Sequence, residues 1–230
     1  MKLLRLLGFA LFAFSVTARG DLTIVQTMEG SEGSNKITFK VKGDKARIEM
    51  GPRATTIVDV KSGDLTTLLN DKKAVMRVSG ERAKAMAELA KAFVKDEVPE
   101  QPVPKPTGRK ETILGYETEE YVSDSPKFHA IYWVAKTYPN YQQILQQMSL
   151  LKQGAFASIT KSLPDYRALP GLPLRTKVNI PGQGEVTSTI ESVSLAPVSP
   201  SEFAVPPGYS EMQMPDFLGG KKAPDKSSTP

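Results

Sequence analysis

"NKITFKVKGDKARIEM", residues 35–50, contains the pattern that decides the fold. Ile37, Phe39 and Val41 alternate with polar residues, and a Gly-Asp pair then interrupts the run before a second one begins. Successive side chains of a strand point to opposite faces of a sheet, and turns that contain glycine join neighbouring strands. The stretch therefore predicts two antiparallel strands, each with one apolar and one polar face.

The same period of two extends in both directions from this stretch. Residues 22–79 alternate in this way between short turns, which predicts a meander of five or six antiparallel strands. Further alternating stretches occupy residues 110–122 and 172–195, and residues 127–135 are apolar at nearly every position. An apolar run of that kind predicts a strand that is covered on both faces. The expected fold class is mainly β (α+β).

Two stretches change to the helical period. Residues 81–95 place apolar side chains three and four positions apart, and Ser79 precedes them as a candidate cap. Residues 138–153 carry a bulkier apolar stripe, with glutamines on the opposite side. The two stripes comprise Met86, Leu89 and Phe93, and then Tyr141, Ile144, Leu145, Met148 and Leu151. Both helices are predicted to be amphipathic and to cover the sheet, because no other part of the chain can bury their stripes.

The two ends of the chain differ in composition from the middle. Residues 1–18 have a basic start, a short apolar run and a small-residue end, which is typical of a signal peptide. The run is too short for a spanning helix, so we expect an exported protein, periplasmic or extracellular, without a membrane span. Residues 19–212 are predicted to form a single domain with a proline-rich loop at 97–107. Residues 213–230 have the composition of a disordered tail.

Composition excludes several classes of function. Of the 230 residues 40% are apolar and 24% charged, as in an ordinary globular protein. Removal of residues 1–18 takes away Lys2 and Arg5 and no acid, so the net charge falls from +5 to +3, and no nucleic-acid partner is expected. The chain has no cysteine, which excludes disulfides and cysteine-based catalytic or metal sites.

The remaining candidates for chemistry are few. Glu117, Glu119 and Glu120 form the densest acid group, but strand alternation sends Glu120 to the opposite face from the other two. We interpret residues 108–124 as an architectural hairpin with a solvated acidic face. His129 is the only histidine, and we interpret it as a half-buried polar residue within the apolar strand. The sequence predicts no catalytic residue, no metal site and no cofactor, and therefore no enzyme.

Two patterns carry a family resemblance. One is "LGYETEEYV" at 114–122 followed by "IYWVA" at 131–135, and the other is the ending "SPSEFAVPPGY" at 199–209. Together they resemble the periplasmic lipoprotein-carrier (LolA-like) superfamily. Within it they are most similar to an exported bacterial branch described as a domain of unknown function, over roughly Asp21 to Tyr209. The resemblance implies a curved antiparallel sheet that forms an open, incomplete barrel with helices at its mouth.

In the carriers of that superfamily, the space between sheet and helices holds the acyl chains of lipoproteins or other amphiphiles. We therefore expect a non-catalytic cell-envelope protein that binds an apolar or acylated ligand, a lipid or a lipoprotein acyl chain. The expected contacts come from strand 127–135 and helix 138–153. They are Tyr132, Trp133, Tyr141, Leu145 and Met148. The alternative is a structural or interaction module with a filled core, which presents its sheet edge or proline-rich loop to another envelope protein.

Overall fold

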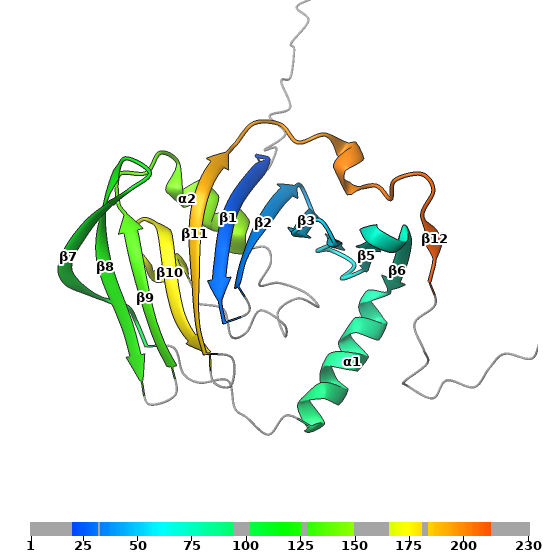
Figure 1. Cartoon of the computed structure of the whole chain (residues 1–230), viewed down its shortest axis with the longest axis horizontal. Helices are drawn as coiled ribbons and strands as arrows, with labels where there is room; N and C mark the ends of the chain where they lie inside the picture. Colours follow the sequence, from blue (N-terminus) through cyan, green and yellow to red (C-terminus); the bar gives the residue numbers. More distant parts are fainter. Residues whose placement is uncertain are drawn as a thin grey trace, which may run out of the picture.

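The computed structural model describes residues 20–31, 33–93, 102–125, 128–149, 166–180 and 184–212. These residues form one curved sheet whose two ends stay apart (Figure 1). Its strands are β1 (Leu22–Gly30), β2 (Gly33–Lys42), β3 (Lys45–Met50), β4 (Ala54–Asp59), β5 (Leu65–Leu69), β6 (Ala74–Val78), β7 (Lys105–Ile113), β8 (Tyr116–Ser125), β9 (Phe128–Ala135), β10 (Leu172–Ile180), β11 (Gly184–Ser194) and β12 (Ser210–Glu211). The mainly β fold, with a curved and open antiparallel sheet and two helices, is confirmed.

The strand order is β12-β6-β5-β4-β3-β2-β1-β11-β10-β9-β8-β7. The first six strands form one meander and β7 to β11 form a second, and the two meanders are joined where β1 pairs with β11. Neighbouring strands are antiparallel except β12, a two-residue strand that pairs parallel to β6 and that the sequence did not predict. The first strand of the chain therefore lies near the middle of the sheet.

Three irregularities in the strand register accompany the curvature. They lie between Val25 and Gln26 in β1, between Pro173 and Arg175 in β10, and between Pro106 and Lys110 in β7. A β-bulge bends its strand and increases the local twist. The sheet consequently curls around one of its faces instead of lying flat.

The two helices differ in how they meet the sheet. Helix α1 (Gly80–Phe93) reaches away from the end of β6, and none of its described side chains enters a buried cluster (Figure 1). The predicted cap is confirmed, because the Arg82 amide donates to Ser79 Oγ over 3.3 Å. Helix α2 (Tyr141–Met148) begins three residues later than predicted, because Asn140 adopts a left-handed conformation with φ 55°.

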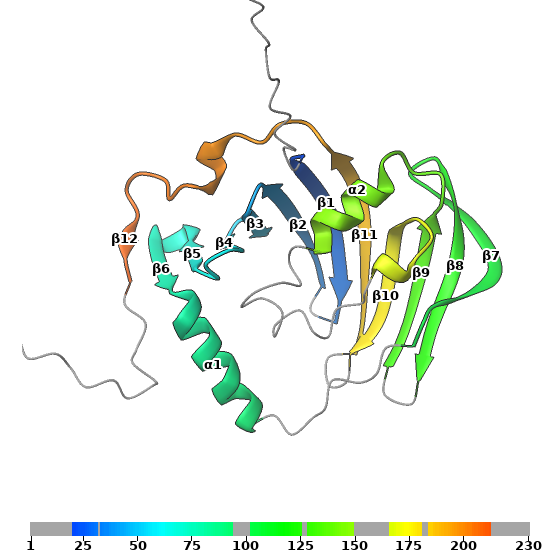
Figure 2. The ribbon, with the colours of Figure 1, turned by 180° about the vertical axis from the view of Figure 1, so that it is seen from behind.

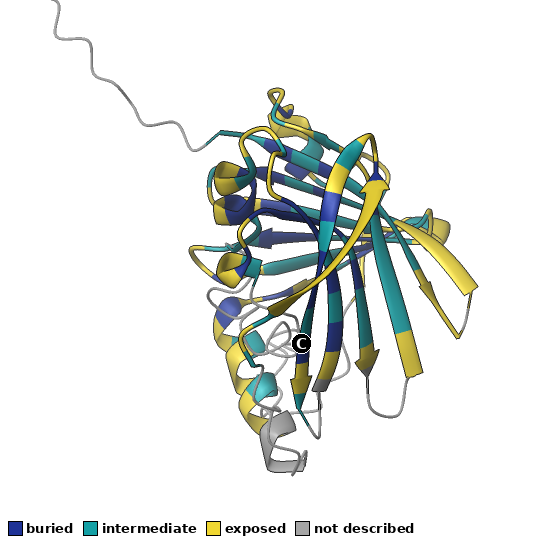
Figure 3. Cartoon of the chain, turned by 90° about the vertical axis from the view of Figure 1, so that its left-hand side faces the viewer, coloured by how far each residue is buried: buried dark blue, intermediate teal, exposed yellow. Residues whose placement is uncertain are grey.

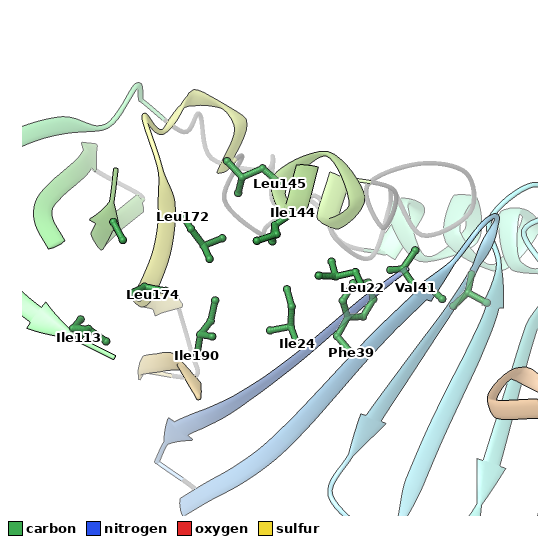
Figure 4. Packing of buried hydrophobic residues seen from close by; sticks show 13 residues of the cluster. Leu22, Ile24, Phe39, Val41, Ile113, Ile144, Leu145, Leu172, Leu174 and Ile190 are labelled. Carbon is green, nitrogen blue, oxygen red and sulfur yellow. The ribbon is translucent and has the colours of Figure 1, made fainter. Parts of the chain in front are cut away.

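Within the described residues, buried apolar side chains form three clusters. The main cluster joins α2 to strands from both meanders (Figure 4). Its members are Leu22, Ile24, Phe39, Val41, Ala46, Val58, Ile113, Ala135, Ile144, Leu145, Leu172, Leu174 and Ile190. A second cluster lies around Tyr132, and a third packs Val198 and Phe203 on residues of β4, β5 and β6. The apolar positions of the period-two stretches thus supply most of the core.

The predicted proline-rich loop and the second predicted helix lie only partly within the described residues. The predicted proline-rich loop ends at residues 102–104, after which β7 begins and carries Pro106 at the edge of the sheet. Proline is tolerated at such an edge because its missing N–H need not pair. The start of that loop, the predicted signal peptide and the predicted tail lie outside the described residues, as does residue 154, where helix 138–153 was expected to end.

Asp21 connects three parts of the chain. Its Oδ2 atom accepts hydrogen bonds from Lys42 Nζ at the end of β2 and from the Val198 amide, each over 2.7 Å. Burial by itself would raise the pKa of Asp21, but the hydrogen bonds from Lys42 and Val198 and the Lys42 charge outweigh it. The pKa is therefore held below its ordinary value.

We predict that Asp21→Asn lowers the free energy of unfolding by about 1 to 3 kcal/mol at pH 7, because charge-assisted hydrogen bonds are lost. A carboxylate whose pKa is lower in the folded state stabilises the fold at pH values above its ordinary pKa of about 3.9. This stabilisation is lost as the pH falls through the lowered pKa. Urea unfolding at pH 7 and at pH 2 to 3 measures this. The difference in the free energy of unfolding between the parent and Asp21→Asn should become smaller in acid. The control Asp71→Asn, at an exposed position, should show no comparable difference from the parent at either pH. An equal difference for Asp21→Asn at both pH values would contradict this role of Asp21.

Candidate ligand-binding site

Helix α2 lies against the inner face of the curved sheet (Figure 2). Ile144 and Leu145 point from it into the main cluster and are buried, while Tyr141 and Met148 are half-buried and pack against the same cluster. The stripe follows helical spacing, which places these four side chains along one side of the two turns. Among the described elements, α2 packs most closely with β10 and with the short helix Tyr166–Ala168.

The sheet below α2 is apolar and tightly covered. Leu172 and Leu174 of β10, Leu22 and Ile24 of β1, and Ile190 of β11 are almost completely buried there (Figure 4). These strands come from both meanders, so the cluster fills the centre of the sheet rather than one end. The surface between α2 and this part of the sheet is the candidate ligand-binding site.

The structure brings four of the five predicted contact residues to this cluster. Tyr141, Leu145 and Met148 reach it from α2, and Trp133 packs against its border, half-buried, with the Arg175 guanidinium 5.5 Å from the indole ring. Tyr132 belongs to the separate second cluster, since successive residues of a strand face opposite sides. Its ring stands edge-on to Tyr166 at 6.2 Å. Burial, and then the neighbouring Tyr166, raise the pKa of the Tyr132 hydroxyl far above its ordinary value.

One polar residue of the site was not predicted. Gln142, Gln143 and Gln146 of α2 are exposed as the sequence pattern indicates, but Gln147 is only 5% exposed. Neither Nε2 nor Oε1 of Gln147 has a hydrogen-bond partner within the described part of the chain. Sequence could not reveal this, because Gln147 belongs to the same run of glutamines as its exposed neighbours.

The acidic hairpin of β7 and β8 is architectural, with one correction. Glu117 pairs with Lys110 at 2.9 Å, and Glu119 with Lys136 at 2.5 Å. Glu120, however, is 3% exposed rather than solvated, and the guanidinium of Arg109 covers its carboxylate with an Nη2–Oε1 distance of 2.5 Å. Strand alternation separates Glu120 from the other two acids as predicted, but the face to which it points is buried.

His129 is more exposed than the sequence analysis predicted. Its side chain is 47% exposed and its Nδ1 lies 3.1 Å from Asp124 Oδ1 on β8. It is the second residue of β9, where it lies between Asp124 of β8 and Asn179 of β10. No group of three or more His, Asp or Glu side chains in the described ranges could hold a metal ion. Among the same residues, no helix combines the length and the apolar character needed to cross a membrane.

A family model described as "Domain of unknown function (DUF4412)" matches residues 19–209. The chain belongs to the DUF4412 family. The match confirms the expected membership in a family of unknown function, over nearly the range that the sequence motifs indicated. No curated protein matches the chain significantly.

Several solved structures are similar to this DUF4412 chain at low sequence identity. PNGF-II is 16% identical with a TM-score of 0.39, and the match covers 85% of this chain but only 32% of the PNGF-II chain. A DUF1329 family protein from Desulfovibrio piger is 12% identical with a TM-score of 0.35, covering 82% and 91% of the two chains. A LolA superfamily protein from Nitrosomonas europaea is 12% identical with a TM-score of 0.31, covering 80% and 89%.

We predict that Arg109→Ala lowers the free energy of unfolding by about 1 to 3 kcal/mol, because it leaves the buried Glu120 carboxylate without its cation. Lys110→Ala is the matched control: it removes the neighbouring cation from Glu117, which is exposed, and should cost much less stability than Arg109→Ala. Denaturant unfolding of the two variants at pH 7 makes the comparison. Equal effects would show that burial of Glu120 does not depend on Arg109.

Proposed function

We propose that this DUF4412 protein is an exported, non-catalytic cell-envelope protein that binds an apolar or acylated ligand between α2 and the inner face of the sheet. The supporting observation is the position of α2, a two-turn helix whose apolar side covers the most buried part of a sheet that remains open. A lipid or the acyl chain of a lipoprotein is the expected occupant. Residues 1–18 support export through their signal-peptide pattern.

The packing of α2 on the sheet makes it a movable cover, a helix that can shift to admit a ligand. A helix of eight residues is not stable in water by itself, so α2 depends on the packing of Ile144 and Leu145 against the strands below. Apolar burial has no direction and scales with the area removed from water. An acyl chain inserted between α2 and the strands would offer the same kind of surface to both.

The sheet can keep its own structure while α2 moves. Every strand from β1 to β11 is paired through backbone hydrogen bonds with its neighbours, and α2 takes no part in that ladder. The two end strands, β7 and β12, do not meet, so the inner face has an open side (Figure 1). A shift of α2 therefore exchanges side-chain contacts without breaking strand pairing.

The second function differs in what fills the space. The buried residues under α2 would then be an ordinary closed core, and the protein would act as an interaction module that presents an edge of its sheet to another envelope protein. Strand β7 is such an edge: eight of its nine residues are exposed (Figure 3). Addition of a strand from another protein is disfavoured at this edge by Pro106, by the bulge and by the neighbouring lysines. We therefore prefer ligand binding to the interaction module.

Titration of the purified mature protein with a fluorescent fatty acid tests the proposal, with Leu145→Glu as the variant and Gln146→Glu as its control on the exposed side of α2. The parent should bind saturably. Leu145→Glu should weaken binding at least tenfold because a charge then borders the apolar site, and it should remain folded because α2 can move outward. Gln146→Glu should bind like the parent. Met148→Glu, at a half-buried position, serves as a second variant.

A closed core would give a different result. The parent would show no saturable binding at high micromolar concentration. Leu145→Glu would lose several kcal/mol of stability and melt at a much lower temperature, because it would bury an unpaired charge. That pair of results would retire ligand binding and leave the interaction module.

A further inference from the structure

We infer that Gln147 forms hydrogen bonds with the polar head of the ligand, and that this head is a primary amide at the end of the acyl chain. The inference rests on the proposed function, because it concerns the same site. It starts from the one side chain of α2 whose burial contradicts its chemistry. Gln147 is 5% exposed, and both polar atoms of its amide lack a partner within the described residues.

An orphaned amide is a costly feature to keep in a core. A buried donor or acceptor without a partner costs about 1 to 3 kcal/mol, and nearly all buried polar groups in proteins are hydrogen-bonded. The neighbouring exposed glutamines show that α2 tolerates this residue type on its wet side, so solubility does not explain Gln147. A bound molecule that pairs with the amide would remove the cost.

The position of Gln147 suits a head group. It follows Ile144 by three residues and precedes Met148, so it borders the apolar stripe of α2. A methyl group placed on Gly20 would lie 3.4 Å from Gln147 Nε2, which locates the amide beside the start of β1. Leu22, the first residue of that strand, is fully buried in the main cluster. An acyl tail along the cluster would therefore end at Gln147.

The chemistry of the side chain selects among heads. Nε2 donates and Oε1 accepts, so complete pairing requires a ligand group with both an acceptor and a donor. An ester or an ionised carboxylate supplies acceptors alone and leaves Oε1 without a partner. A primary amide presents its carbonyl oxygen and one N–H on the same edge, so it can supply the oxygen to Nε2 and the N–H to Oε1. A secondary amide is trans, so its C=O and N–H point in opposite directions and only one of them can reach Gln147. The structure thus assigns preference to acyl chains that end in a primary amide over those that end in an ester.

Two uncharged probes that differ in their head group test this preference. Dodecanamide and methyl dodecanoate are each used to displace the fluorescent fatty acid from the mature protein. The parent should bind the amide about three- to tenfold more tightly than the ester. Gln147→Met, of equal length and without the amide, should bind both equally and keep the parent's affinity for the ester within about threefold. Gln146→Met, on the exposed side, should retain the preference for the amide.

Melting temperatures of the unliganded proteins separate recognition from a structural role. Gln147→Met should melt at or above the parent's temperature, because it removes an unpartnered buried amide. Equal affinities of the parent for the two probes would overturn the inference while leaving ligand binding intact. A lower melting temperature of Gln147→Met with an unchanged amide preference would overturn it too, by making Gln147 a structural residue. Failure of the parent to bind either probe would instead remove the proposed function, and this inference with it.

Discussion

The pairing of β1 with β11 is the interaction on which the rest of the structure depends. It joins two meanders that are far apart in sequence, with a register from Thr23–Ser194 to Glu29–Thr187. Leu22 and Ile24 of β1 are buried directly beside this junction, and the helix that covers the sheet lies over the same region. Because contacts of such long sequence separation are slow to form, we expect closure of this junction to be a late step of folding.

The inner and outer faces around this junction have different chemistry. On the inner face, apolar side chains of β1, β10 and β11 share one buried cluster with Ile144 and Leu145 of α2. Burial of such apolar surface has no preferred direction. Elsewhere on β1 and β11, Thr27 donates to Glu191, and Glu191 also pairs with Lys36 of β2 at 2.7 Å. The hydrogen bond from Lys36, and then that from Thr27, hold the pKa of Glu191 below its ordinary value. The polar contacts tie the strands to one another, so the sheet does not rely on α2 for its integrity.

The sequence predicted which segments form strands and helices better than it predicted which strands lie side by side. Alternation identifies which residues of a strand share a face, which is why Ile37, Phe39 and Val41 were assigned correctly to one side, but it carries no information about which strand lies alongside. The β1–β11 junction and the short β12 follow from that missing information. The burial of single polar residues could not be predicted either. Glu120 pairs with Arg109 across its hairpin, and Gln147 lies beside Gly20, which is far away in the sequence. Helix α2 was identified by its stripe, and its start moved because Asn140 adopts a left-handed conformation.

The most direct test of whether α2 is a movable cover over the β1–β11 junction is hydrogen–deuterium exchange. Exchange is measured on the mature protein with and without saturating fluorescent fatty acid. The account predicts that bound ligand changes protection in α2 and in β10 and β1, while β4, β5 and β6, which pack against Val198 and Phe203, keep theirs. Unchanged exchange in α2 at saturation, or a change confined to β4 to β6, would contradict it, because the ligand would then occupy a different part of the molecule.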